Sequence, residues 1–430
     1  MALLTTILAR MSGVLLQVIS LPIAAMQLGA AGFSIYAMLG SLLAAMTLSN
    51  LGIGQATTLH MSRVLAVGET NTGRELFMAS LCVLGGIATA VTALAVLLIL
   101  LSPLIPLIFA QYIDELPAPV GPALFVCFVF LATQLLSVFE AAQLAQQRQH
   151  RLNIALGIGS LVAAAAVWFA ATTRPDVLSI LIAVHLPSIA ARSFNAARVW
   201  VDISPKRRDL TAARCYVRDI LKDGLKFVSG TSFANFLCHP FSVLAVGFFA
   251  MPLSSASFAA LMNAIILASS VNSLFVTPLR GAIPEALRSG DHTWLRMAML
   301  RMYGISAIYG LIVFVVLAVT GERLFEIWYR GAVDPQASEL LGAGLYFVVL
   351  SIEVTNFTYL SNVGLLPAAS RAMLIKGVCS AIAVLLVSYL GYFYLAFWVL
   401  LVANIVFALI PHMTMMIAAS SQATQDEHER

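Results

Sequence analysis

Two apolar segments of this 430-residue chain carry polar side chains at helical spacing. The first set is Thr6, Arg10, Gly13, Gln17 and Ser20, and the second is Ser232, Asn235, His239 and Ser242. Steps of three and four place each set on one face of an α-helix, and an offset of 222 residues superimposes Arg10 on Ser232 and Gln17 on His239. Such stripes either join neighbouring helices by hydrogen bonds or line an aqueous cavity. Their matching positions favour a shared cavity, in which Arg10 binds an anion.

Four ionisable residues interrupt apolar runs: Arg10, Glu140, His239 and Glu353. A charge at membrane depth costs at least ~2.5 to 3.5 kcal/mol, so such residues seldom face lipid. The alternative for Arg10 is a side chain that extends to the headgroups. Glu140 lies beside a glutamine-rich stretch and is interpreted as an interfacial residue.

His239 and Glu353 are the candidates for ion or proton coupling. His239 precedes Pro240, which predicts a kink in its helix at the imidazole. Tyr346, Glu353 and Asn356 fall on one helical face inside an apolar run. A protonated, hydrogen-bonded structural glutamate is the alternative for Glu353. The hypothesis is that His239 and Glu353 take part in proton-linked transport.

The composition indicates that lipid is the solvent of this chain. Hydrophobic residues make up 60% and charged residues 10%, with a mean hydropathy of +0.94. The net charge of +4 sits in short loops, as orientation in a bilayer requires, so nucleic-acid binding is excluded. The five cysteines have no C-x-x-C spacing and no nearby histidine cluster, which predicts neither a metal site nor a disulfide framework. No cofactor is expected.

Twelve apolar runs are long enough to span a bilayer at 1.5 Å per residue. The first six are 3–27, 33–59, 76–101, 121–144, 152–171 and 177–194, and the second six are 227–251, 257–279, 297–320, 341–360, 372–390 and 392–417. With both termini in the cytoplasm, 21 of the 24 Lys and Arg residues, Lys376 included, fall on the cytoplasmic side. Only Arg174, Arg323 and Arg330 then lie outside.

The predicted organisation is an N-terminal six-helix bundle at 1–198, a basic amphipathic linker at 199–226, a C-terminal six-helix bundle at 227–419 and a disordered cytoplasmic tail at 420–430. The linker carries Leu210, Val217, Ile220 and Leu221 at helical spacing, which predicts a helix lying on anionic lipid. A short turn before Phe33 recurs before Phe258, 225 residues later. The fold class is therefore an all-α integral membrane protein with two pseudo-symmetric six-helix bundles around a central cleft.

No motif for catalysis is present: the chain has no H-E-x-x-H, no G-x-S-x-G and no Walker A loop. The predicted outer loops are short, so no outer domain can carry chemistry. The chain is not expected to be an enzyme, although a membrane transferase with catalytic residues in short loops stays open.

The chain resembles the Wzx-type flippases of lipopolysaccharide and exopolysaccharide, in the multidrug/oligosaccharidyl-lipid/polysaccharide exporter superfamily. The residues that carry the resemblance are the opening helix from Leu8 to Pro22, the turn from Leu28 to Tyr36, the segment Leu51-Gly52-Ile53-Gly54 and, in the second half, Thr277-Pro278-Leu279-Arg280. It covers nearly the whole length of the chain.

The resemblance implies a bacterial inner-membrane protein that turns a polyprenyl-pyrophosphate-linked oligosaccharide from the cytoplasmic to the periplasmic leaflet by alternating access. Arg10 would bind the pyrophosphate, and Gln17, Asn235 and His239 would donate or accept hydrogen bonds. Membrane lipid is an expected partner. Direct binding of a polysaccharide polymerase or a chain-length regulator stays open, as do the glycan and the driving ion.

Three other classes of protein are alternatives to a Wzx-type flippase. A cation-coupled multidrug exporter of the same superfamily shares the twelve-helix plan, but it favours acidic cavity residues, of which Glu353 is the one candidate. A major-facilitator carrier requires a Gly- and Arg-rich signature that the segment 60–75 lacks. A polysaccharide polymerase or acyltransferase is the enzymatic alternative, and polymerases need a longer basic outer loop.

Overall fold

The computed structural model describes residues 2–101, 109, 112, 120–227, 231–276 and 279–418. The predicted tail at 420–430 and residues Thr277 and Pro278 lie outside this part of the chain. The described residues fold into helices that form two compact units, 1–229 and 230–430. Each unit is a bundle, so the predicted all-α, two-bundle class is confirmed.

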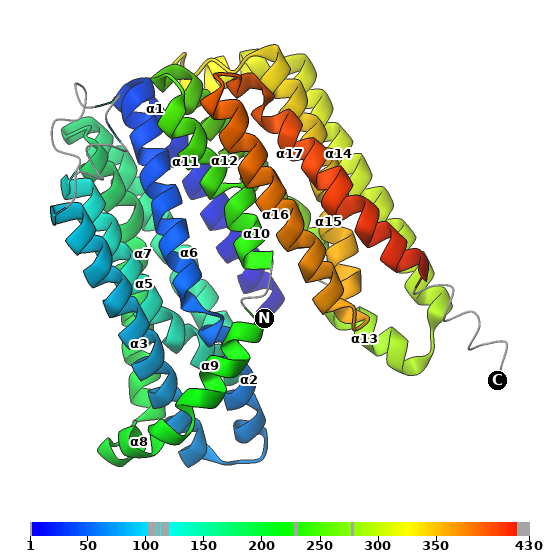
Figure 1. The fold of residues 1–430 in the computed structure, drawn as a ribbon. Helices are drawn as coiled ribbons and strands as arrows, with labels where there is room; N and C mark the ends of the chain where they lie inside the picture. Colours follow the sequence, from blue (N-terminus) through cyan, green and yellow to red (C-terminus); the bar gives the residue numbers. More distant parts are fainter. Residues whose placement is uncertain are drawn as a thin grey trace. The chain divides into compact units, whose positions relative to one another are not determined.

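Unit 1 contains eight α-helices among its described residues (Figure 1). They are α1 (Ala2–Thr47), α2 (Ile53–Ala66), α3 (Thr70–Leu101), α5 (Val120–Ala145), α6 (Gln149–Thr173), α7 (Val177–Ile203), α8 (Arg207–Ala212) and α9 (Val217–Phe227). Gly29 divides α1 into two membrane-length segments, because its φ of 68° breaks the helical path in a region of φ/ψ space that favours glycine.

Unit 2 repeats this plan. Its helices are α10 (Thr231–Cys238), α11 (Pro240–Phe249), α12 (Pro252–Val276), α13 (Leu279–Ser289), α14 (His292–Tyr329), α15 (Ala337–Asn362), α16 (Leu366–Tyr389) and α17 (Ala396–Asn404), followed by a π-helix at Ile405–Leu409. Eleven helical segments of the described chain are long and apolar enough to cross a membrane, and separating the two halves of α1 at Gly29 gives the predicted twelve.

The same helix pairs pack together in both units, which is the structural form of the internal repeat. In unit 1, α1 packs on α6, α3 on α5, and α5 on α7; in unit 2, α10 and α11 pack on α16, α14 on α15, and α15 on α17. The short helices α2 and α13 also correspond. Helix α2 packs on α3 and α5, and α13 packs on α14 and α15, which are the matching helices of unit 2. The predicted pseudo-symmetry therefore extends to the packing inside each bundle.

Two predicted element boundaries are wrong. The second run, 33–59, ends at Thr47, because a 3-10 turn and two left-handed residues, Leu51 and Gly52, separate it from α2. The recurring turn of the second half lies at Ala250, in extended conformation, ahead of Pro252, so the segment 253–257 is already helical. Phe33 and Phe258 are nevertheless both fully buried in their units.

Large apolar side chains remain exposed along the long helices. Leu101 and Val319 are each 76% exposed, and many Leu, Ile and Val side chains of α6, α14 and α16 are exposed as well. A contiguous apolar surface of this extent is not stable in water, so these faces contact lipid. The chain is therefore a multi-pass membrane protein.

The linker helix α9 packs on protein, which corrects the prediction that its apolar stripe lies on lipid. Ile220 is completely buried in the core of unit 1, and Leu221 packs against the same core. His60 of α2 and Asp223 of α9 are joined at 3.0 Å between Nε2 and Oδ2. Leu210 of α8 stays exposed, so only that part of the stripe faces outward. We call the end of unit 1 that holds α8 and α9 its basic end.

Replacing Gly224 with alanine is expected to lower the apparent melting temperature of the protein in detergent. A Cβ at this position would lie 2.7 Å from the backbone oxygen of Leu51, and such overpacking costs about 1 to 3 kcal/mol. Gly86→Ala is the matched control, because a Cβ there has no neighbour within 4 Å. Equal melting temperatures for the two variants would contradict the tight packing of α9 on the Leu51 turn.

Candidate functional site

The break between α10 and α11 places His239 at the centre of a polar cluster in unit 2. Pro240 opens α11 and has no backbone N–H to donate, so the helix is interrupted at His239 as predicted. The backbone of His239 still donates to Asn235 and accepts from Val243, each at 3.1 Å, which keeps the two pieces in line. The imidazole Nε2 lies 3.0 Å from the hydroxyl of Tyr346 on α15.

A buried ion pair joins α15 to α16. The Nζ of Lys376 donates to Oε2 of Glu353 at 3.1 Å, and each side chain is only 1% exposed. Both charges are removed from solvent, where their attraction is strong but desolvation is costly. Glu353 is therefore in contact with the amine of Lys376, a partner on the neighbouring helix that the sequence did not predict.

The position of Lys376 differs from the prediction that counted it among the charges at the cytoplasmic side. It lies ten residues after the start of α16, and Glu353 lies nine residues before the end of α15, so the two residues are at similar depth on antiparallel neighbours. The sequence carried this signal, because a lone Lys inside a predicted span requires a partner at equal depth. Sequence reasoning missed it by counting Lys376 among the charges on the cytoplasmic side, although the eleventh predicted span, 372–390, contains it.

Several other buried polar groups surround this ion pair. His412 and His239 both lie within electrostatic range of Lys376, and His412 Nε2 is 3.2 Å from the carbonyl oxygen of Ala369. Among the described residues, Oε1 of Glu353, Nδ1 of His412 and both amide atoms of Asn404 are buried without a hydrogen-bond partner. Other buried polar atoms without a partner occur elsewhere in both units, for example at Thr92 and Ser269, so the Glu353–Lys376 pair is the main distinguishing feature of this region.

The helix after Asn404 is also irregular. Residues Ile405–Leu409 form a π-helix directly after Asn404, which is fully buried. Insertions of this kind are uncommon and concentrate at functional sites. Together with the interruption at His239, it means that two of the helices around the Glu353–Lys376 pair depart from regular α-geometry beside polar residues.

The polar residues of the α1 stripe form two groups, one facing the bundle and one exposed. Thr6 accepts a hydrogen bond from Asn153 of α6 at 2.9 Å, and Ser20 is 3% exposed, so these residues face the bundle. Arg10 and Gln17, seven residues apart, are exposed on unit 1. Arg10 lies roughly 12 Å along the helix from Ala2, at 1.5 Å per residue.

The matching stripe of unit 2 becomes more buried along the chain. Asn235 is exposed and His239 is partly buried, whereas Ser242 is fully buried and donates to the carbonyl oxygen of Cys238 at 2.9 Å. The structure therefore joins His239 and Glu353 into one cluster through Tyr346 and Lys376. Asn235 lies on the exposed side of the same helix, and Arg10 and Gln17 belong to unit 1.

Comparison with known proteins gives matches in structure only. No family model and no curated protein matches the sequence. An inward-facing multidrug resistance MATE family transporter of the MOP superfamily aligns with a TM-score of 0.69 at 14% identity, over 96% of this chain and 99% of the other.

Two further solved structures show the same likeness. The eukaryotic MATE transporter AtDTX14 aligns with a TM-score of 0.70 at 15% identity, covering 99% of this chain and 97% of the other. The lipid II flippase MurJ, in an inward closed conformation, aligns with a TM-score of 0.73 at 11% identity, covering 96% and 87%. The two six-helix bundles described above thus have the fold that MATE transporters of the MOP superfamily share with MurJ.

Proposed function

We propose that this protein is a flippase that moves a polyprenyl-pyrophosphate-linked oligosaccharide from the cytoplasmic to the periplasmic leaflet of a bacterial inner membrane, by alternating access between its two bundles. The exposure of Arg10 at membrane depth on the first helix carries the proposal. An exposed guanidinium on this polar stripe can donate several hydrogen bonds to an anionic headgroup, and charged residues inside membrane spans often mark substrate pathways. The shared fold with a lipid II flippase supports the same reading.

In this proposal the exposed residues of the two stripes bind the polar part of the substrate. Arg10 binds the pyrophosphate, because a guanidinium presents several donors to phosphate oxygens. Gln17 and Asn235 are exposed amides that donate to and accept from sugar hydroxyls. His239 provides a further hydrogen-bonding group, while the polyprenyl chain stays in lipid. Both termini are placed in the cytoplasm, in accordance with the excess of Lys and Arg in the loops on that side.

Coupling to an ion or proton is assigned to His239 and Glu353. The contacts of His239 with Tyr346, and of Glu353 with Lys376, place both residues in one cluster that connects three elements of unit 2. A change in protonation at His239 would alter the charge facing Lys376, so the cluster can link a proton to the packing of α15 and α16.

Arg10→Ala is expected to abolish assembly of the surface polysaccharide in cells that depend on this protein. Loss of a charged hydrogen-bonding group costs about 1.5 to 3 kcal/mol, which corresponds to a roughly tenfold to hundredfold loss of affinity. Met11→Ala is the matched control, because Met11 is an exposed neighbour on α1 without charge. Both variants are to be compared at equal abundance in the membrane. Normal polymer in the Arg10→Ala strain would refute the role of Arg10.

A cation-coupled multidrug exporter is the second candidate, supported by the fold shared with MATE transporters. The environment of Glu353 favours it less, because this carboxylate is fully buried and already paired with Lys376, which leaves it poorly placed to attract a cationic drug. Deletion of the protein distinguishes the two functions. Altered drug sensitivity with unchanged surface polysaccharide would support the exporter.

A further inference from the structure

A groove at the basic end of unit 1 combines positive charge with exposed apolar surface. It lies between the start of α6 and the end of α7 and has a volume of about 570 Å³. Its lining residues are Arg151, Phe194, Ala197, Arg198, Val201 and Asp202. Because these residues sit in the first turn of α6 and the last three turns of α7, the groove lies where a spanning helix meets the headgroup region.

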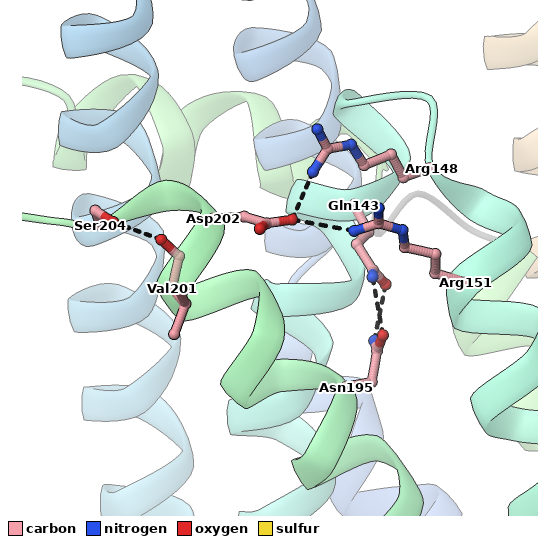
Figure 2. A network of polar contacts seen from close by, with 7 residues as sticks. All are labelled: Gln143, Arg148, Arg151, Asn195, Val201, Asp202 and Ser204. Carbon is pink, nitrogen blue, oxygen red and sulfur yellow. Dashed lines mark hydrogen bonds and ion pairs between the residues drawn. The ribbon is translucent and has the colours of Figure 1, made fainter.

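Two arginines share one carboxylate at this position, and a third arginine lies beside them. Arg148 and Arg151 both donate to Oδ2 of Asp202, at 2.5 and 3.1 Å, and Figure 2 shows the two guanidinium groups converging on it from the same side. The guanidinium of Arg198 lies 4.4 Å from the ring centroid of Phe194. This stacking holds the third cation beside the pair. The groove therefore carries an excess of positive charge.

The helices around the groove are joined by a second polar contact. Gln143 of α5 and Asn195 of α7 exchange two amide hydrogen bonds, at 2.9 and 2.8 Å, next to the arginines in Figure 2. Both side chains are buried, so this reciprocal pair holds α7 in place against α5. Arg198 therefore lies on a helix whose position is fixed by its contact with α5.

Apolar side chains continue from the charged groove along the outer face. Phe194 is 63% exposed and Val201 is 70% exposed. On α6, Ile154 and Ile158 follow Arg151 at steps of three and four residues, so they lie on the same helical face, and they are 50% and 54% exposed. A free soluble anion would not contact this apolar surface, whereas an anionic lipid has both a charged headgroup and an acyl chain.

We propose that this groove binds the phosphate of an anionic phospholipid, with an acyl chain lying along Ile154 and Ile158. The headgroup phosphate accepts hydrogen bonds from Arg151 and Arg198, while Asp202 offsets part of the positive charge of Arg148 and Arg151. The site belongs to unit 1 alone and does not depend on the transported substrate. It gives α6 and α7 a fixed depth in the leaflet next to the basic end.

Native mass spectrometry of the purified full-length protein tests this proposal. Phosphatidylglycerol is titrated against zwitterionic phosphatidylethanolamine, for the unmodified protein and for the variant Arg151→Gln with Arg198→Gln. Removing two cations near the surface is expected to weaken phosphatidylglycerol binding about tenfold or more, with little change for the zwitterionic lipid. Arg174→Gln is the matched control, because Arg174 lies at the opposite end of α6 and is also exposed.

A second variant is expected to have the opposite effect on phosphatidylglycerol binding. Asp202→Asn removes the carboxylate that competes for Arg148 and Arg151, so phosphatidylglycerol binding is expected to increase, a result that misfolding would not produce. Equal phosphatidylglycerol binding by the double-arginine variant and the control would overturn the proposal. Displacement of phosphatidylglycerol by millimolar inorganic phosphate would overturn the choice of a lipid, and stronger competition by a polyprenyl pyrophosphate would assign the groove to the transported substrate instead.

Discussion

Glu353→Ala alone is expected to destabilise the protein by about 3 to 5 kcal/mol, because it leaves the ammonium of Lys376 buried without its partner. The expected readout is a large fall in the apparent melting temperature in detergent, together with low abundance in the membrane. Arg174→Ala is the matched control, since it removes an exposed ion pair with Asp176. Exposed pairs contribute at most about 1 kcal/mol.

The double variant Glu353→Leu with Lys376→Met separates stability from function. Replacing both members of a buried pair by apolar residues of similar volume is often neutral or stabilising by about 1 to 4 kcal/mol, so this protein is expected to fold. If the pair couples an ion to transport, polymer assembly is lost although the protein is stable and abundant. Normal transport by this double variant would show that the pair does not couple an ion to transport.

Gly377→Ala is expected to give the second large effect. Gly377 lies on α16 where α10 approaches most closely, and a Cβ there would lie 2.7 Å from the Cα of Ala234 and 3.1 Å from its Cβ. A backbone atom cannot move aside as a flexible side chain can, so α10 must shift away from α16 at a cost of about 1 to 3 kcal/mol. That shift also displaces His239, which follows α10, from Tyr346.

Gly304→Ala is the control for this experiment, because a Cβ at Gly304 on α14 has no neighbour within 4 Å. In mid-helix it is expected to stabilise by up to about 1 kcal/mol through helix propensity. Opposite shifts in melting temperature for the two variants are therefore predicted, and stabilisation by Gly377→Ala would contradict the close packing of α10 on α16. Reduced transport at equal abundance would further link this packing to the His239 cluster.

The helices were predictable from the sequence because a span is a local property. Twenty consecutive apolar residues form a helix in lipid whatever their neighbours, since every backbone group must be paired within the segment. The kink at Pro240 was predictable for the same reason, because the missing N–H is local. The end of the second predicted span, 33–59, was not predictable, since hydropathy does not reveal the left-handed residues Leu51 and Gly52.

The partners of the polar residues could be identified only from the packing of the helices in the bundle. Glu353 was recognised from its cost in an apolar run, yet its pairing with Lys376 depends on the register of α15 against α16. Ile220 was assigned to lipid from its amphipathic helix, but the same apolar stripe can be covered by protein, and the core of unit 1 covers it.

The sequence by itself determined that this protein is solvated by lipid, where its twelve membrane-length segments lie and which residues are too polar for their surroundings, because hydropathy and helical spacing act along the chain. The tertiary structure alone decided that His239 meets Tyr346, that Glu353 neutralises Lys376 and that Asp202 gathers two arginines. Such contacts join residues distant in sequence, and only helix packing sets the distance between them.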